Sequence, residues 1–559
     1  MEKQKLPIGI DVFEKLIRED FYYVDKTYAI KDLLDSWSEV NLFTRPRRFG
    51  KSLFLSMLYQ FFDLDTDKSV FSGLKIIEDK SLCNTYMGKY PVIFVSLKSV
   101  DALTFSSAFE KLKIVMRSEV WRIKKQIGDE KLSEKELSYL SLFTSMTASQ
   151  EEYESLLLGL SEIMMSHFGK RIIILLDEYD VPLDKAYING YYEEMVSFIR
   201  GFFGNAFKSN RNLFFAVLTG CMKVSKESIF TGINNMDANT IIDERHDEIF
   251  GFTELEVNRM LECYGLEKRS EDIKRWYDGY RFGSKDIYCP WDVISAVKKL
   301  SVDINCELQP FWINTSGNDI VRRFINNSDR NTRNDIERLI HGEAVEKKIN
   351  MELTYRDIDS NIDNLWSVLF ITGYLTSRKR FKDGFFSLQI PNHEIREIFK
   401  NEIIRWFEES VLAQKNNLRD LCSALKKGKA ETVEKILNEL LSNSISILDT
   451  KASKGKKENF YHGFLIGLLS SKENWLVRSN RETGDGFADI IIYSDDPDIG
   501  ILIEVKYSDT PLCMESDAKR ALSQIESKRY EELFVSEGIN NIRSYGISFS
   551  KKRCRVLIK

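Results

Sequence analysis

The sequence predicts an α/β fold in several domains, with a parallel N-terminal sheet, a helical middle region and a second α/β domain at the C-terminal end. Three observations indicate this arrangement. Before residue 230, buried aliphatic runs alternate with helical stretches, which is typical of a parallel sheet. After residue 251 the apolar spacing becomes helical, and near residue 490 two strand-like runs flank a short turn.

The length of the chain requires more than one domain. Its 559 residues are several times the usual size of about 100 to 200 residues per domain. A hydrophobic content of 43% with 30% charged residues, and only 9 Pro and 29 Gly, indicates folded domains and not long disordered linkers. We therefore expect domains at residues 1–250, 251–445 and 446–559.

Location and partners are constrained by composition. The N-terminus has no apolar signal core and no run has the roughly 20 apolar residues of a membrane span, so we expect a cytoplasmic protein without a membrane partner. The eight cysteines have no zinc-ligand spacing, which favours reduced thiols. A net charge of -5 does not attract polyanions, so nucleic acid would need a local basic surface. No residue identifies a subunit contact, which leaves an oligomer open.

The first chemical motif is the loop of residues 45–52, which ends in Gly50-Lys51-Ser52. It follows a buried strand at residues 40–44 and precedes an apolar helix. In phosphate loops, backbone N–H groups and the helix N-terminus hold phosphates, the lysine (here Lys51) reaches the β and γ oxygens, and the serine (here Ser52) holds Mg²⁺. Arg45 stands where this pattern has its first glycine, and the short motif alone is equally compatible with an ordinary helix start. The expected ATP-binding segment comprises Arg48, Phe49, Gly50, Lys51, Ser52 and Leu53.

Two further strands end in polar residues. The run at residues 171–176 ends in Asp177 and Glu178, at the edge where α/β sheets bind ligands. Asp177 is expected to contact ATP-bound Mg²⁺ and Glu178 to orient or deprotonate the attacking water, although the acids could simply be solvated. The run at residues 212–218 ends in Thr219, which either contacts the γ-phosphate or only terminates the strand. With the strand at residues 90–96, the order suits an additional-strand ATPase core.

Two further segments, at residues 8–10 and 23–27, belong with the loop at 45–52 and the strand ends at 176–180 and 218–220. Together these segments resemble the bacterial and archaeal AAA-ATPase-like family. The resemblance implies an AAA/STAND-like P-loop NTPase that uses ATP and Mg²⁺, and its arginine-rich loop accounts for the missing glycine. Members are commonly fused to a C-terminal PD-(D/E)XK nuclease domain.

The middle region carries aromatic segments at residues 276–283, 312–317 and 369–375 that resemble segments of the same family. Their rings could stack on bases, but aromatic side chains are more often part of the core. Residues 400–445 read as amphipathic helices, and the basic stretch at 451–457 predicts a hinge or exposed turn.

A second chemical motif lies near the C-terminal end. Asp489 belongs to one strand, and Glu504, Val505 and Lys506 end the returning strand. Pairing across this hairpin can bring Asp489 beside Glu504, where both carboxylates and the Val505 carbonyl can bind Mg²⁺. Lys506 would then orient water or neutralise the phosphate transition state, as phosphodiester hydrolysis requires. The alternative is a strand pair with ordinary surface charges.

Neighbouring residues can complete this site. Glu458 and His462 lie one helical turn apart and either extend the metal shell or are a surface acid and a packed histidine. Gln524 and Tyr530 lie in a helix-forming stretch. The segment from residue 446 resembles the PD-(D/E)XK superfamily, which implies a restriction-endonuclease-like fold.

Two functional hypotheses follow. In the first, ATP binding or hydrolysis gates cleavage of DNA by the C-terminal domain. In the second, the protein is a nucleotide-dependent switch or scaffold whose C-terminal domain binds nucleic acid or protein without cutting. One departure bears on the choice, because Phe487 and Ala488 stand where many relatives carry a basic residue.

Overall fold

The computed structural model divides the chain into two compact units. The first comprises Met1–Ile320 and Ala344–Glu397, and the second comprises Val321–Glu343 and Ile398–Lys559. The boundary predicted at residue 446 lies outside the described residues. Those are 4–208, 210–223, 235–312, 319–358, 360–413, 415–442, 454–470, 472, 474–483 and 486–559.

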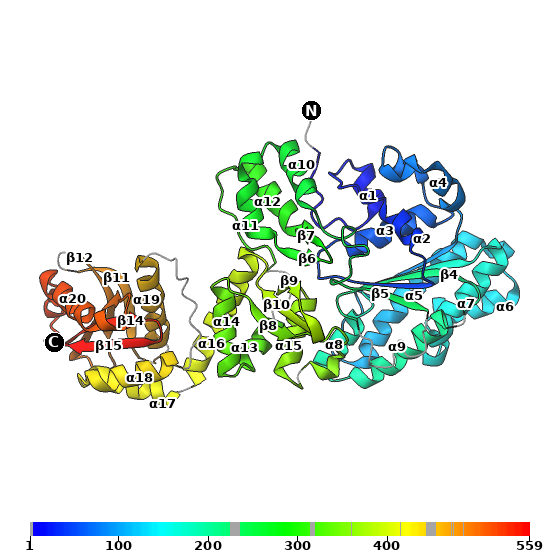
Figure 1. Cartoon of the computed structure of the whole chain (residues 1–559). Helices are drawn as coiled ribbons and strands as arrows, with labels where there is room; N and C mark the ends of the chain where they lie inside the picture. The colour runs from blue at the N-terminus through cyan, green and yellow to red at the C-terminus, as the bar shows by residue number, and fades with distance from the viewer. Residues whose placement is uncertain are drawn as a thin grey trace. The chain divides into compact units, whose positions relative to one another are not determined.

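Five parallel strands form the main sheet of the first unit (Figure 1). They are β1 (Val40–Thr44), β2 (Val92–Ser96), β3 (Ile172–Asp177), β4 (Leu213–Gly220) and β5 (Met236–Asn239). The order β2-β3-β4-β1-β5 places β4 between β1 and β3, which confirms the predicted additional-strand core. The sequence did not indicate β5, because this short edge strand is only partly buried.

Helices pack around this sheet. The α3 helix packs against β2, β3 and β4, while α6 and α7 each begin with a serine whose side chain and a following glutamate form a capping box. The helices are α1 (Phe13–Arg18), α2 (Ala29–Asp35), α3 (Lys51–Phe62), α4 (Lys80–Tyr86), α5 (Phe105–Ile127), α6 (Glu134–Thr144), α7 (Gln150–Phe168), α8 (Val181–Asn189) and α9 (Tyr192–Phe207), with short 3₁₀ turns η1 (Lys68–Phe71), η2 (Lys75–Glu78) and η3 (Asp129–Lys131).

The rest of the first unit confirms the helical middle region but adds two small sheets. Its helices are α10 (Glu254–Tyr264), α11 (Ser270–Tyr277), α12 (Pro290–Val302) and α15 (Ile362–Ile371), with 3₁₀ turns η4 (Glu267–Arg269), η5 (Tyr355–Asp357) and η6 (Lys382–Gly384). One sheet pairs β6 (Tyr280–Phe282) with β7 (Lys285–Ile287), and the other has β8 (Val345–Lys348), β10 (Phe385–Gln389) and β9 (Thr376–Arg380) in that order. These strands are only three to five residues long, and β7, β8 and β9 are rich in charge, so the sequence contains no long buried run that would predict the two sheets.

The second unit contains a five-stranded mixed sheet in the order β11-β12-β13-β14-β15. Its strands are β11 (Leu476–Thr483), β12 (Gly486–Tyr493), β13 (Ile499–Tyr507), β14 (Asn541–Ser550) and β15 (Arg553–Ile558). The predicted hairpin is β12 and β13, and β13 pairs with β14 in parallel. The remaining helices are α13 (Asp319–Asn326), α14 (Arg330–Ile340), α16 (His393–Ala413), α17 (Lys415–Lys426), α18 (Ala430–Ser442), α19 (Lys454–Ser470), α20 (Met514–Ser527) and α21 (Glu532–Ser536), with the 3₁₀ turn η7 (Pro511–Cys513).

The start of α19 differs from the sequence-based expectation. The basic stretch at 451–457 was predicted to be a hinge or exposed turn. Residues 451–453 lie outside the described residues, but Lys454 begins α19. The later turns of α19 are held in place by apolar packing. Lysine is a good helix former, so the helix can continue toward its N-terminus through the lysines of this stretch.

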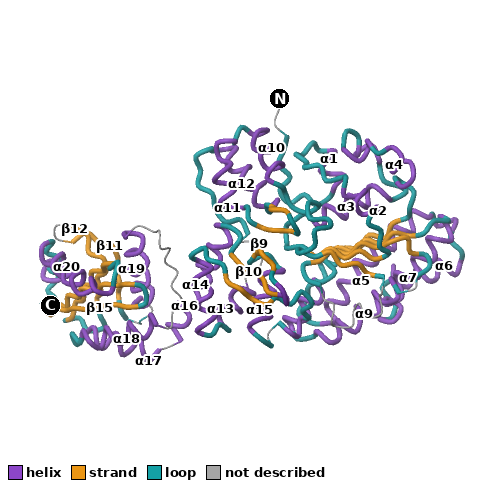
Figure 2. The backbone as a smooth tube through the Cα atoms, in the orientation of Figure 1, coloured by secondary structure: helices purple, strands orange, loops and turns teal. Residues whose placement is uncertain are grey.

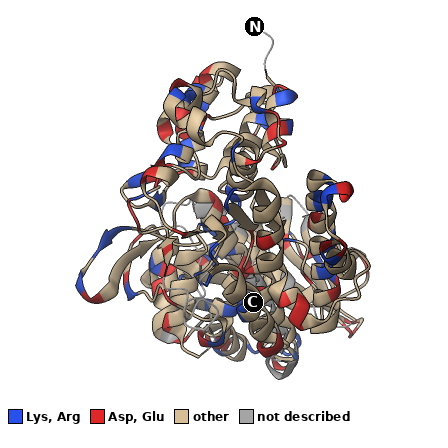
Figure 3. Ribbon diagram, turned by 90° about the vertical axis from the view of Figure 1, so that its right-hand side faces the viewer, with Lys and Arg blue, Asp and Glu red and all other residues tan. Residues whose placement is uncertain are grey.

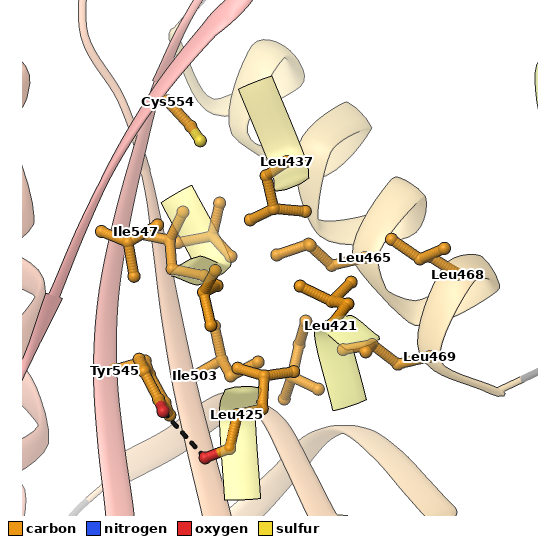
Figure 4. Packing of buried hydrophobic residues seen from close by; sticks show 14 of the residues in the cluster. Leu421, Leu425, Leu437, Leu465, Leu468, Leu469, Ile503, Tyr545, Ile547 and Cys554 are labelled. Atoms are coloured by element: carbon orange, nitrogen blue, oxygen red, sulfur yellow. Dashed lines mark hydrogen bonds between the residues drawn. The ribbon is translucent and has the colours of Figure 1, made fainter. Parts of the chain in front are cut away.

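Helices cover both faces of the second sheet. Side chains from α17, α18 and α19 pack on one face, and the ring of Tyr545 there donates its hydroxyl hydrogen to the Leu425 carbonyl at 2.8 Å (Figure 4). On the other face a smaller cluster includes Ile525 and Phe534 from α20 and α21. Figure 2 shows the strands between these helices. Strand β13 is therefore packed on both faces.

The surface carries charges of both signs. Figure 3 shows basic and acidic residues interspersed over the ribbon. None of the described helices combines the length and apolar character needed to span a bilayer.

Truncating Leu437 tests the packing under β13. Leu437 is 1% exposed within the cluster, so Leu437→Ala should destabilise the second unit by about 2–5 kcal/mol. The measurement is thermal unfolding followed with a probe in each unit. The matched control is Leu512→Ala, since Leu512 is 94% exposed. Equal stability of the two variants would contradict the packing described above.

Candidate active sites

The first site begins at the loop between β1 and α3. Gly50 has a positive φ of 87° and precedes the first turn of α3, where a residue with a side chain would be strained. Lys51 is buried, and its ammonium donates to the carbonyls of Arg45 and Pro46 at 2.9 and 2.8 Å. The loop thus curls around the lysine charge, as a phosphate-binding loop requires.

Asp177 is the centre of the polar network beside this loop. Its carboxylate accepts hydrogen bonds from Ser52 Oγ and Thr219 Oγ1, both at 2.7 Å. Ser96 Oγ adds a longer contact of 3.4 Å. The three hydroxyl groups come from α3, β4 and β2. The carboxyl edge of the sheet therefore brings together Ser52, Asp177 and Thr219, which were predicted from the sequence. Ser96 was missed, although it ends a strand just as Asp177 does.

Glu178 follows Asp177 with a positive φ of 52°, which is uncommon for a residue with a side chain. Burial and the neighbouring Asp177 raise the pKa of its carboxyl group. Asp180, which sequence reasoning also missed, accepts the backbone N–H groups of Cys221 and Met222 at 2.7 and 3.0 Å. It ties the end of β3 to the segment that follows β4.

Arg45 explains how the loop forms without its first glycine. Its guanidinium is fully buried and donates to the carbonyls of Thr44 and Asn239, both at 2.9 Å. It also lies over the rings of Phe250 and Phe282. Burial lowers its pKa to about 10. The arginine therefore braces the loop from inside the protein.

Arg48 and Phe49 direct their side chains toward the middle region. Phe49 is 1% exposed and packs at 5.0 Å from the ring of Tyr280. Arg48 donates to the Phe311 carbonyl at 3.3 Å and lies 4.8 Å over the ring of Trp291. The side chains of these two residues thus pack on the middle region, and the half-buried Leu53 follows in the first turn of α3.

The second site lies where β12 and β13 stop pairing. Their ladder ends at Ile490 and Ile503, and the next N–H on that side, from Val505, donates to Asp489 Oδ2 at 2.8 Å. Because the N–H and C=O of one strand residue point the same way, the Val505 carbonyl faces the same gap. Glu504 is 1% exposed and accepts from Lys506 Nζ at 2.9 Å. The predicted carboxylates are thus adjacent.

The electrostatics of this pair suit a cation. Burial, and then the charge of Asp489, raises the pKa of Glu504 to about 7, while Lys506 opposes the shift. Two carboxylates and a backbone carbonyl are hard oxygen donors of the kind Mg²⁺ prefers. Among the described residues, no three acidic, histidine or cysteine side chains converge on one ion position. Backbone and water oxygens would have to complete the coordination.

The neighbouring candidates are placed around this gap. Glu458 Oε1 accepts the Tyr507 N–H at 3.1 Å, so α19 brings a third acid to the same strand. His462 Nε2 lies 2.8 Å from the Asp489 carbonyl, which indicates a packing role for this histidine. Gln524 Nε2 donates to Tyr530 Oη at 3.4 Å. The described contacts do not connect Gln524 directly to the carboxylates.

Comparison with known proteins matches the two parts of the chain that contain these sites. A family model described as a predicted AAA-ATPase covers residues 7–230, and one for the PD-(D/E)XK nuclease superfamily covers residues 456–558. The chain joins an AAA-ATPase-like domain to a PD-(D/E)XK nuclease superfamily domain. It is also 28% identical, over 76% of its length and 75% of the relative, to an "Uncharacterized protein in vnfD 5'region" of Azotobacter chroococcum mcd 1.

Behind the phosphate loop of the AAA-ATPase-like domain lie two buried carboxyl groups, which the sequence did not indicate. Asp292 and Glu394 are both 0% exposed and lie close enough for each to affect the pKa of the other. Glu394 Oε1 also accepts the Trp312 N–H at 2.6 Å. The thiol of Cys289 and the guanidinium of Arg48 are the other groups beside Asp292. Burial raises the pKa of Asp292 to about 6 and that of Glu394 to about 9.

This pair predicts a pH-dependent stability. Because the folded protein holds these protons more tightly than the unfolded chain, the free energy of unfolding should fall from about pH 4, where the unfolded carboxyl groups ionise, to about pH 9, by up to about 1.4 kcal/mol per pH unit for each proton still bound. Above about pH 6 only the proton of Glu394 contributes. Glu394→Gln keeps the hydrogen bonds without titrating and should flatten this slope. Unfolding temperatures across that range provide the measurement.

The control for this experiment is Glu267→Gln, since Glu267 is exposed and in no described ion pair. Its slope should equal that of the wild-type protein. A Glu394→Gln slope that also matched the wild type would show that this carboxyl does not titrate in the folded protein.

Proposed function

We propose that the chain binds and hydrolyses ATP at the loop of residues 45–52 and uses this to control cleavage of DNA by its C-terminal domain. Arg48, Phe49, Gly50 and Leu53 would supply backbone contacts to the phosphates, and Lys51 would neutralise their charge. We place this activity in the cytoplasm, because ATP is available there and because free cysteines such as those of this chain suit a reducing compartment. In this proposal the ATPase domain comprises residues 1–250, the linking region residues 251–445 and the nuclease domain residues 446–559.

The observation that carries the ATPase proposal is the shared contact of Ser52 and Thr219 with Asp177. Ser52 and Asp177 would hold Mg²⁺, whose chemistry is to draw charge from the phosphate oxygens. Thr219 lies on the same carboxylate and can contact the γ-phosphate or the attacking water. Glu178, with its raised pKa, can accept a proton from that water more readily than an exposed glutamate.

For the nuclease, the support is the meeting of Asp489, Glu504 and Lys506 at the open end of a strand pair. Asp489, Glu504 and the Val505 carbonyl would hold Mg²⁺, which activates water and stabilises charge on the phosphate. Lys506, bonded to Glu504, would orient that water or neutralise the transition state. The substrate would be the phosphodiester backbone of DNA.

A specific observation favours the alternative of a nucleotide-dependent switch or scaffold. No third acidic or histidine side chain among the described residues completes an ion position with Asp489 and Glu504. In addition, Phe487 and Ala488 provide no basic contact to a phosphate. Under this alternative the C-terminal domain binds nucleic acid or protein and does not cut it.

Lys51→Ala tests the nucleotide site. Loss of the ammonium inside the loop should weaken ATP binding by at least about 10-fold, since charged hydrogen bonds contribute about 1.5–3 kcal/mol. Isothermal titration with a non-hydrolysable ATP analogue measures this affinity. Lys131→Ala, at an exposed lysine, should leave the affinity unchanged. Retained affinity in Lys51→Ala would rule out the assignment of the loop.

Lys506→Ala tests the nuclease site. Removing the charge beside Glu504 should slow cleavage of plasmid DNA in Mg²⁺ by about 100-fold, as for other transition-state contacts. Lys519→Ala, whose lysine is exposed on α20, is the matched control and should cleave normally. If wild-type protein cuts neither linear, supercoiled nor branched DNA at any ATP concentration, the switch is the better description.

A further inference from the structure

We propose that the outer face of the β8-β10-β9 sheet binds a single-stranded segment of nucleic acid, with lysines on its phosphates and Phe385 against a base. This inference rests on the proposed function, because it assumes that the chain acts on nucleic acid. The sheet lies in the first unit, and neither family match covers its residues. Figure 2 shows β9 and β10 side by side.

The register of the sheet defines this face. Phe386 and Leu388 of β10 are buried on the other side, where the ring of Phe386 lies 5.3 Å from that of Phe370 in α15. Strand residues alternate between faces, so Phe385 and Ser387 point outward. Their partners share that face, Lys348 opposite Phe385 and Lys379 opposite Ser387.

The charge of this sheet is concentrated and positive. In a chain of net charge -5, residues 345–348 and 376–384 carry six basic residues against Glu346 and Asp383. The basic residues are Lys347, Lys348, Arg378, Lys379, Arg380 and Lys382. A local field of this kind attracts a polyanion even though the whole protein does not.

Three of these lysines are available to a ligand. Lys348, Lys379 and Lys382 are exposed, and no ion pair joins them to any acidic residue in the described parts of the chain. Arg378, by contrast, lies 3.5 Å from Asp286. Arg380 covers the ring of Phe386. The three lysines therefore carry the charge that a phosphate backbone would meet.

An exposed aromatic ring on the same face, with a half-buried one beside it, favours a single strand over a duplex. The side chain of Phe385 is 41% exposed. The Lys379 ammonium lies 4.8 Å over the ring of Phe381, whose N–H donates to the Phe385 carbonyl at 2.8 Å. Bases of a single strand can stack on such rings while adjacent cations hold the backbone. One exposed ring among lysines offers too little apolar area for a protein partner.

The test is the binding of a fluorescein-labelled thymidine 30-mer to the full chain in EDTA, followed by fluorescence anisotropy over a salt series. Replacing Lys348, Lys379 and Lys382 with alanine should weaken binding at least 10-fold. The slope of log affinity against log salt should become shallower by about 2, because each of the three lost phosphate contacts contributes about 0.7 to that slope. Phe385→Ala should weaken binding about 10-fold with the slope unchanged, as expected for a stacking contact.

The matched control replaces Lys131, Lys135 and Lys268, which are also exposed, and should bind like the wild type. Wild-type affinity in the first triple variant would overturn the surface, and normal plasmid cleavage by that variant would leave the proposed nuclease standing. A duplex bound as tightly as the single strand, with no effect of Phe385→Ala, would overturn the stacking. Equal displacement by polyglutamate would overturn the choice of nucleic acid.

Discussion

The hydrogen-bonded carboxylate of Asp177 is the point on which the first unit's site depends. It binds hydroxyl groups from α3 and from the end of β4 while sitting at the end of β3. Both bonds form only if β1, β4 and β3 are aligned as observed, with Phe43 opposite Thr219 and Leu176 opposite Leu218. A shift of one residue would turn the polar ends to opposite faces of the sheet. Correct strand pairing and assembly of the site are therefore one event.

The second unit reaches a similar result by ending a strand ladder. Beyond Ile490 and Ile503 the backbone of β13 is free to bond with side chains, and Asp489 and Glu458 accept its N–H groups. The paired strand β14 still supports β13 from the other side. An acidic cluster can thus be buried without leaving backbone groups unsatisfied.

Buried charge is used differently around the phosphate loop. Arg45 donates from its two terminal nitrogens to backbone carbonyls, so it stiffens a loop that lacks the usual first glycine. Asp292 and Glu394 lack donors for some of their oxygens, and burial raises the pKa of both carboxyl groups. Because Arg48 lies beside this pair, the shape of the loop and the protonation of the middle region are physically linked.

The sequence by itself determined the four main strands of the parallel sheet, the C-terminal hairpin and the polar residues at their ends, since burial and alternation are local patterns. The roles of Glu178, Asp489 and Lys506 remain predictions from those patterns. Only the tertiary structure decided that Arg45 and Phe49 turn inward and that Asp292 meets Glu394. Short charged strands such as β9 could not be predicted from the sequence either. These features depend on packing between residues far apart in the chain, and no local spacing encodes which side chains such packing brings together.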